Sequence, residues 1–558
     1  MAERLPTVGT REAEVEFLRT VARARDASGR EAWDEAVPLW GTVVEANPVT
    51  AEFWSALGDA RAKAADHSGA IAAYRHALDL GAGFPFDTAY RIALCHARDG
   101  RLDEALSWIE RAFELGYRNL EGAQTDETFA SLRDSNRFRE LVGLIDAGNF
   151  SRDDGWRYDL AFFAREVKRK AFFPFRNVSE EAFDAAVARL HEDIPQLSEY
   201  EILVEMRKIL VLLGDGHASA YVLDDHPLSP ATLPVQFFLF EEGLFVIAST
   251  PEHASLLGAQ VLRVGDSTIE DVFGAIAPAI TRDNDYWLKL VVPYELRDTS
   301  LLHALGLCPS PDRVELTTRL LDGSEQGIEL PAGSNKSFGQ LWNDVRDPKD
   351  WHYFLNSLAS PLPHYLRNQT VPYWFEYLQA EQAIYFQFNR VADDATERFA
   401  DFSERLFRFI DDYAVRKLVI DVRGNNGGNT FLEMPFLHRL IGSRINRRGS
   451  LFVIIGRRTF SAAQNFSSMI ERHTEAIFVG EPTGASPNFV GENINIELPY
   501  SKVGTNVSDL YWQSTWPMDH RTWIAPLLYL PPTFAAYQEN RDPALEAILA
   551  WNDHLPGM

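Results

Sequence analysis

Apolar positions follow two different periods in the last third of the chain, and the change between them predicts the order of its elements. Segments rich in apolar residues, typical of buried strands, lie at 383–388, 417–423, 451–455 and 476–480. Between them, apolar residues recur at three- and four-residue steps, which predicts amphipathic helices over 399–410 and 462–470. Strands that alternate with helices indicate an α/β layer, whose ligands bind at the carboxyl ends of the strands.

The first 118 residues follow a different pattern, a repeat whose units start at Phe17, Ala51 and Phe86. The clearest unit, the second one, places its key residues at relative positions 4, 7, 8, 20, 24 and 27: Trp54, Leu57, Gly58, Ala70, Tyr74 and Ala77. Small residues at 8, 20 and 27 let paired helices pack closely, and this spacing resembles the tetratricopeptide repeat. The resemblance implies an α-helical solenoid that can bind a peptide or a partner helix. A helical domain without repeats is the alternative.

The remaining segments divide the chain further. Residues 119–150 have the pattern of capping helices, and a polar stretch at 151–155 follows as a linker. The next segment is helical, and after it comes a β-rich region in which Gly258 to Val272 predicts a strand, a tight turn and a helix start. That stretch resembles the later half of a PDZ domain. We therefore expect a multidomain protein with domains at 1–150, 156–230, 231–330 and 331–558.

Composition excludes several classes of function. The 558 residues include 54 Lys and Arg against 80 Asp and Glu, a net charge of −26, which argues against sequence-independent binding of nucleic acid. The N-terminus lacks the apolar core of a secretory signal, and no apolar run approaches the roughly 18 residues of a membrane span. Cys95 and Cys308 stand alone, without the spacing of a disulfide framework or a zinc site. We expect a cytoplasmic protein that needs no cofactor and does not bind membranes.

Ser461 lies where the strand at 451–455 turns sharply into the helix that starts at Ala462. The first turn of a helix leaves backbone N–H groups unpaired, and these groups favour negative charge. A serine there can attack a carbonyl carbon while a neighbouring N–H group receives the oxyanion. Serine is also a common N-cap with a purely structural role. Residues elsewhere in the chain must decide between the two interpretations.

Two glycine-containing turns offer candidate partners for Ser461. His217 follows an apolar helix in the sequence GDGH, and a neutral imidazole accepts protons near pH 7. A loop histidine that caps the helix is the structural alternative. The turn from Gly424 to Asn429 leaves the strand at 417–423, and its N–H groups can form an anion nest. The G-x-x-x-x-G-K-[ST] pattern of a phosphate loop is missing.

The combination of motifs is more specific than any one of them. IDVRGNNGGN, RRTFSAAQN and VGEPTG occur in this order with GDGH upstream. Over about residues 156–558 the chain thereby resembles the C-terminal processing (tail-specific) peptidases and the related tricorn core. The resemblance implies a ClpP/crotonase-like α/β core, often preceded by a PDZ-like module. It further implies Ser461 as nucleophile, with oxyanion donors from the N–H of Ala462 and from the turn at Gly427 and Gly428.

The chain differs from the processing branch in the residue that would act as the catalytic base. The lysine of that branch, about twenty-five residues after the serine, falls here on Ser486, so the Ser–Lys dyad is absent. The tricorn-like branch uses a histidine from the GDGH region instead, which makes His217 the predicted base, although tricorn's preceding serine is Gly216 here.

A histidine base needs an acceptor that orients its ring. Where tricorn supplies a glutamate, this chain has Asp519, which is our first choice, with Glu492 and Asp215 behind it. His217, Asp519 and His520 lack the spacing of a metal motif such as H-E-x-x-H, and we expect no metal.

The leading hypothesis is a serine endopeptidase that hydrolyses unfolded or short peptides through an acyl-enzyme on Ser461, with His217 as base. The absent lysine motivates an alternative, a catalytically inactive scaffold that binds protein or peptide partners through its repeat domain. A third hypothesis, an acyl-thioester enzyme, rests on the crotonase-like fold alone.

Overall fold

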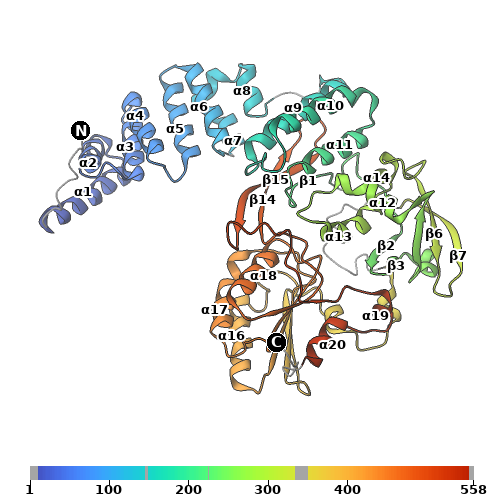
Figure 1. The fold of residues 1–558 in the computed structure, drawn as a ribbon. Coiled ribbons are helices and arrows are strands. Elements are labelled where there is room, and N and C mark those ends of the chain that lie inside the picture. The colour runs from blue at the N-terminus through green and yellow to red at the C-terminus, as the bar shows by residue number, and fades with distance from the viewer. Residues whose placement is uncertain (1–10, 118, 145–148, 224, 334–349, 552–558) are drawn as a thin grey trace. The chain divides into compact units, whose positions relative to one another are not determined.

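The computed structural model describes residues 11–117, 119–144, 149–223, 225–333 and 350–551 (Figure 1). The first ten residues of the predicted repeat domain and residues 334–349 of the predicted core therefore lie outside the described residues. The chain forms two compact units, one of residues 1–151 with 168–170 and one of the remaining residues. Each unit is described by itself.

The first unit is entirely helical within its described residues. Its helices are α1 (Arg11–Gly29), α2 (Trp33–Ala46), α3 (Ala51–Lys63), α4 (His67–Asp79), α5 (Pro85–Arg98), α6 (Leu102–Glu114), α7 (Leu120–Thr125) and α8 (Asn136–Leu141), with the 3₁₀ turn η1 (Glu127–Leu132). Gly58 shows why small residues recur, because a Cβ atom there would lie 2.5 Å from the ring of Tyr74 on the next helix. The predicted helical N-terminal region is confirmed.

The second unit begins with helices α9 (Arg152–Lys170), α10 (Glu180–Asp193) and α11 (Glu199–Val211). Their apolar faces pack on a three-stranded antiparallel sheet in the order β1-β15-β14, whose strands are β1 (Ser219–Tyr221), β14 (Asn488–Glu497) and β15 (Gly504–Gln513). The loop that bears His217 joins α11 to β1. Because β14 and β15 come from the C-terminal third of the chain, this packing brings distant segments together.

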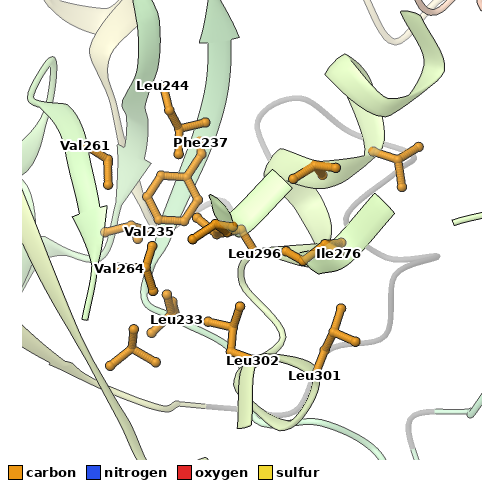
Figure 2. Packing of buried hydrophobic residues seen from close by; sticks show 14 of the residues in the cluster. Leu233, Val235, Phe237, Leu244, Val261, Val264, Ile276, Leu296, Leu301 and Leu302 are labelled. Atoms are coloured by element: carbon orange, nitrogen blue, oxygen red, sulfur yellow. The ribbon is translucent and has the colours of Figure 1, made fainter. Parts of the chain in front are cut away.

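A seven-stranded antiparallel sheet follows, with helices packed on it. Its strands are β2 (Val235–Phe240), β3 (Gly243–Ser249), β4 (Gln260–Val264), β5 (Ser267–Thr268), β6 (Arg313–Arg319), β7 (Glu325–Pro331) and β8 (His352–Tyr353). The helices are α12 (Ile269–Ile276), α13 (Asp285–Glu295) and α14 (Thr299–Ala304). Figure 2 shows strand residues such as Val235 and Phe237 meeting helix residues such as Ile276 in one apolar cluster. The strand, turn and helix predicted from Gly258 to Val272 are confirmed.

The last part of the chain forms a six-stranded sheet in the order β16-β13-β12-β11-β10-β9. Its strands are β9 (Tyr373–Leu378), β10 (Ala383–Phe388), β11 (Lys417–Asp421), β12 (Leu451–Ile455), β13 (Ile477–Gly480) and β16 (Leu528–Tyr529), and β9 alone is antiparallel to its neighbour. Every residue of β10 and β12 is buried, as their largely apolar sequences predict. The predicted strands and the α/β alternation are confirmed.

Helices cover both faces of this sheet (Figure 1). One face packs on α16 (Phe399–Asp412), α17 (Met434–Gly442) and α18 (Ala462–His473), and the other packs on α20 (Pro543–Ala550). The helices predicted over 399–410 and 462–470 are confirmed as α16 and α18. None of the helices in the described residues has the length and apolar character needed to span a bilayer. Within the same residues, His, Cys, Asp and Glu side chains form no cluster suited to a metal ion.

Candidate active site

Ser461 lies in a strained turn between β12 and α18. Its backbone has φ 51° and ψ −125°, in a region that residues other than glycine seldom adopt. The turn is anchored by buried Thr459, whose hydroxyl donates to the Val422 carbonyl oxygen (2.9 Å) and accepts from the Gly456 N–H (3.1 Å). Although Ser461 occupies the N-cap position, its hydroxyl makes no capping bond within the described part of the chain. The strain is therefore not compensated by capping.

The glycine-rich turn after β11 packs directly against this serine turn. The Phe460 N–H donates to the Asn425 carbonyl oxygen (3.2 Å). Gly427 has φ 114°, and a Cβ atom there would lie 2.7 Å from the Ser461 Cβ and 2.9 Å from the Ala462 nitrogen. Gly428 has φ 139°, and its Cβ would lie 2.1 Å from the Val391 carbonyl oxygen. Only glycine permits this approach at both positions.

The predicted oxyanion donors differ in availability. The N–H of Gly427 already donates to the side-chain oxygen of Asn425 (2.9 Å). This N–H group is therefore not available to an oxyanion, in contrast to the prediction from the sequence. The N–H groups of Gly428 and Ala462 make no hydrogen bond among the described residues. An oxyanion hole at this turn would thus consist of Gly428 and Ala462, and Gly427 would contribute by its close approach.

His217 is held in the loop between α11 and β1 by a buried carboxylate. Asp215 accepts the N–H groups of His217 (2.9 Å) and Ala218 (3.2 Å), and it also accepts the N–H (2.8 Å) and hydroxyl (2.9 Å) of Ser508 on β15. The His217 ring packs between two phenylalanine rings, with centroid distances of 4.4 Å to Phe460 and 5.3 Å to Phe489. Loop and ring are therefore fixed by the sheet and by the serine turn.

The same packing determines the charge state of His217. Burial lowers the pKa of the imidazole to about 4, and the Asp215 carboxylate and the Val490 backbone only partly oppose this shift. Neither ring nitrogen makes a hydrogen bond within the described residues. At neutral pH the ring is uncharged, as a proton acceptor must be, and it is packed between the rings of Phe460 and Phe489 near the Val490 backbone.

None of the three carboxylates considered for orienting this ring contacts it by a hydrogen bond in the described residues. Asp519 is paired with Arg521 (2.8 Å), which lowers the pKa of its carboxyl to about 2. It lines a different cavity, on whose wall Phe489 also lies. Glu492 is exposed, and the oxygens of Asp215 are taken by its own loop and by β15. The structure does not bring Asp519 and His217 together.

Two polar residues near the site, Asp283 and Asn465, were not predicted from the sequence. Asp283, before α13, accepts the N–H groups of Gly216 (3.2 Å) and Ser486 (3.0 Å), and burial raises the pKa of its carboxyl to about 6. Asn465, one turn after Ser461, donates to the Thr430 hydroxyl (3.0 Å) and so ties α18 to the glycine-rich segment. Asn465 lies within the motif RRTFSAAQN, which offers a signal, whereas nothing in the local sequence marks Asp283.

Ser461 and His217 line the same cavity, which has a volume of about 550 Å³. We call it the apolar cavity, because its walls include Leu210, Val222, Ile280, Trp287, Val291 and Phe460. Trp287 stacks on Phe460 with ring centroids 4.0 Å apart, and both belong to the apolar cluster of the seven-stranded sheet. At the edge of the cavity Arg207 and Glu295 form an ion pair (3.2 Å). The cavity can hold an apolar side chain next to the serine.

Comparisons with known proteins agree with this arrangement at the level of fold. No protein-family model matches the sequence, and no curated protein matches it. Among solved structures, a CPAF mutant matches with a TM-score of 0.50 and 11% identity over 71% of this chain and 97% of that chain. The photosystem II D1 C-terminal processing protease matches with a TM-score of 0.34 and 12% identity, over 69% of this chain and 96% of the other.

The tricorn protease matches with a TM-score of 0.33 and 13% identity over 72% of this chain, which spans 36% of tricorn's own length. The neighbours thus include a C-terminal processing protease and tricorn, the two groups that the sequence motifs resemble. The similarity that carries weight is that of the fold to CPAF.

Proposed function

We propose that the chain is a serine endopeptidase in which Ser461 is the nucleophile and His217 is the base. One observation carries the proposal: Ser461, in a strained backbone conformation at the start of α18, lines the same cavity as an uncharged, buried histidine. The N–H groups of Gly428 and Ala462 beside it, which make no hydrogen bond to another described residue, match the donors that acyl transfer needs. Each such donor stabilises the transition state by roughly 3 kcal/mol.

The chemistry would proceed in two steps. His217 takes the proton of the Ser461 hydroxyl as its oxygen attacks the peptide carbonyl, and the tetrahedral oxyanion accepts bonds from Gly428 and Ala462. The imidazolium then protonates the leaving amine, and an acyl-enzyme remains. A water molecule, deprotonated by His217, hydrolyses the ester and regenerates the serine. Because the described residues leave both ring nitrogens without partners, the Ser461–His217 bond must form as substrate binds.

Two carboxylates, Asp215 and Asp519, are candidates for the third catalytic role. Asp215 favours the imidazolium through its charge, since it raises the pKa of His217 against the effect of burial. Asp519 would have to leave Arg521 and pass Phe489 to orient the ring. We therefore propose that Asp215 acts electrostatically and that Asp519 takes the orienting role only in a rearranged, substrate-bound state.

The finer domain assignments belong to the same proposal. The close packing of Gly58 on Tyr74 supports a tetratricopeptide-like solenoid over 1–150, which would bring a protein or peptide partner to the enzyme. The parallel strands β10 to β13 with helices on both faces support a ClpP/crotonase-like core over 331–558. Residues 156–230 would complete it, and 231–330 would form a PDZ-like module. We place the enzyme in the cytoplasm, acting on unfolded or short peptides.

Mass spectrometry of a mixed peptide library tests the function directly. Wild-type protein and the Ser461→Ala variant are incubated with the library, and cleavage sites are compared. Cuts made by the wild type and missing with the variant would establish a Ser461 peptidase. Equal and negligible cleavage would favour the scaffold alternative, which is motivated by the missing lysine. The repeat domain would then be the binding part.

A further inference from the structure

Asp283 is a buried carboxylate that takes no part in the proposed proton transfer. It lies directly before α13, where one oxygen accepts the N–H of Gly216 (3.2 Å) and the other accepts the N–H of Ser486 (3.0 Å). Gly216 precedes His217 in the segment 212–218 between α11 and β1, which we call the histidine loop. Ser486 lies between β13 and β14. One side chain therefore joins the histidine loop to a segment that is distant in the chain.

Gly216 and Asp283 lie in close contact. A Cβ atom at Gly216 would lie 2.6 Å from the Oδ1 of Asp283 and 3.1 Å from its backbone nitrogen. Any side chain at position 216 would therefore displace Asp283 or the histidine loop. Gly216 and Ser486 are also the positions at which this chain lacks the serine of tricorn and the lysine of the processing peptidases. Both differences from the related motifs thus meet at one carboxylate.

The start of α13 also supports the ring of His217. Asn284, next to Asp283, donates to the Thr483 carbonyl oxygen (3.1 Å) and so fixes the start of the helix to the segment that contains Ser486. Trp287, on the first turn of α13, stacks on Phe460 with ring centroids 4.0 Å apart. The Phe460 ring in turn lies 4.4 Å from the His217 ring. The same short stretch therefore contacts the backbone of the histidine loop and supports the packing of the ring.

Two carboxylates bind three successive N–H groups of the histidine loop. Asp283 accepts that of Gly216. Asp215 accepts those of the next two residues, His217 (2.9 Å) and Ala218 (3.2 Å). Burial, together with the charge of Asp215, raises the pKa of the Asp283 carboxyl to about 6, although its hydrogen bonds oppose the shift. Two like charges in a buried site are costly, and such arrangements are concentrated at functional sites.

We propose that Asp283 is a positioning residue, which holds the histidine loop so that His217 can accept the proton of Ser461. The inference rests on the proposed peptidase function. Asp283 touches no reacting atom and acts through the backbone that carries the ring. A displacement of about 1 Å at a reacting group can lower a rate on the order of 100-fold. Loss of this carboxylate should therefore reduce the rate of the chemical step more than the affinity for substrate.

Asp283→Asn and a matched control test this role. The variant keeps the shape of the side chain, but its amide nitrogen cannot accept the second N–H group. Asp159 on α9 is the control, because it is also buried and accepts two backbone N–H groups, those of Tyr500 (2.8 Å) and Ser501 (2.7 Å). For a peptide that wild type cleaves, Asp283→Asn should lower kcat about 30-fold and change KM less than about twofold. Asp159→Asn should lower the melting temperature comparably and leave kcat unchanged. Unchanged kcat in Asp283→Asn, or equal losses in both variants, would overturn the proposal.

A double-mutant cycle provides a second test that does not depend on one variant. Gly216→Ala should also lower kcat, because its Cβ atom meets the Oδ1 of Asp283. Asp283→Ala removes that oxygen and relieves the contact. The double variant should therefore lose less activity than the product of the two single losses. Independent effects of the two substitutions would count against the coupling of Asp283 to the loop.

The pH dependence of activity gives a third readout. Because its pKa is about 6, Asp283 is ionised above this pH and becomes protonated below it, which removes an acceptor as Asp283→Asn does. Besides Asp215, the charged and titratable groups that face Asp283 or line the two cavities beside it are Arg176, Arg282, Asp285, Asp519, His520 and Arg521, and all remain in the variant. From pH 7.5 to pH 5, kcat/KM of wild type should fall about tenfold and approach that of Asp283→Asn, which should stay level. Parallel profiles would overturn the proposal.

Hydrogen exchange, which needs no cleavage, distinguishes failure of the inference from failure of the proposed function. Mass spectrometry should show exchange of the histidine loop at least about tenfold faster in Asp283→Asn and unchanged in Asp159→Asn. Faster exchange of the loop, with no cleavage by wild type, would retain the support of the loop by Asp283 and refute the peptidase. Cleavage by wild type, with unchanged kcat and unchanged exchange in Asp283→Asn, would retain the peptidase and refute the positioning role.

Discussion

The two halves of the candidate site are built by different means. The serine half, formed by the Ser461 turn and the glycine-rich turn, depends on positive φ angles and on the missing side chain of Gly427. The histidine half, formed by the loop that bears His217, depends on two buried carboxylates that bind its backbone, Asp215 and Asp283. Steric limits do not change with pH, whereas a carboxylate loses an acceptor when it is protonated. The comparison indicates that a change of shape disrupts the serine half and a change of charge disrupts the histidine half.

Removal of the nucleophile should leave both halves of the site in place and abolish the chemistry. Ser461→Ala is expected to lower kcat/KM on the order of 10⁶-fold, the loss that removal of the nucleophile causes in a serine protease. Fluorescence anisotropy should show unchanged affinity for a labelled peptide substrate, and thermal unfolding should show an intact fold. Residual cleavage within about tenfold of wild type would exclude Ser461 as the nucleophile.

Closing the contact between the glycine-rich turn and Ser461 should break the serine half alone. In Gly427→Ala, the new Cβ atom would meet the Ser461 Cβ at 2.7 Å, and alanine disfavours φ 114°. We expect kcat/KM to fall about 100-fold at pH 7.5 and at pH 5 alike, because the serine turn must shift. Gly442→Ala is the control, since a Cβ atom there would meet nothing within 4 Å. Unchanged activity, or a loss that differed between the two pH values, would contradict this separation of the two halves.

Filling the apolar cavity should leave both halves of the site alone. Val291 on α13 lines this cavity. Val291→Phe should reduce kcat/KM for peptides with a large apolar residue at the cleavage site by roughly 30-fold, because the phenyl ring occupies its place. Peptides with alanine at that site should be cleaved as before. Equal loss for large and small residues would place the substrate side chain elsewhere.

The pH dependence of kcat/KM should reflect the pKa of a buried imidazole rather than that of a solvated one. Because burial lowers the pKa of His217 to about 4, the uncharged base persists until the pH falls through that value. In Asp283→Asn, which lacks the carboxyl that titrates near pH 6, kcat/KM should stay level from pH 8 to pH 5 and be about tenfold lower at pH 3. Circular dichroism at each pH controls for unfolding. An acid limb near pH 6.5 in this variant would show that the ring is solvated in the active enzyme.

The α/β core was the most predictable part of this protein. Segments rich in apolar residues predicted β10 to β13 correctly, because a parallel strand buried on both faces tolerates few polar residues. The motif around Ser461 and the glycines at 427 and 428 were predictable because strained turns restrict which residues can occupy them. The availability of the Gly427 N–H was not, since it depends on a hydrogen bond from that group to the side chain of Asn425.

Taken by itself, the amino-acid sequence determined the order of the elements, the sharp turn at Ser461 and the glycine-rich turn after the strand at 417–423. These features follow from local periodicity and from the steric limits of single residues. Tertiary structure decided the rest: the burial that keeps His217 uncharged and the placement of Asp519 in a different cavity from His217. Each depends on contacts between segments that are distant in the chain. A local sequence pattern does not predict such contacts.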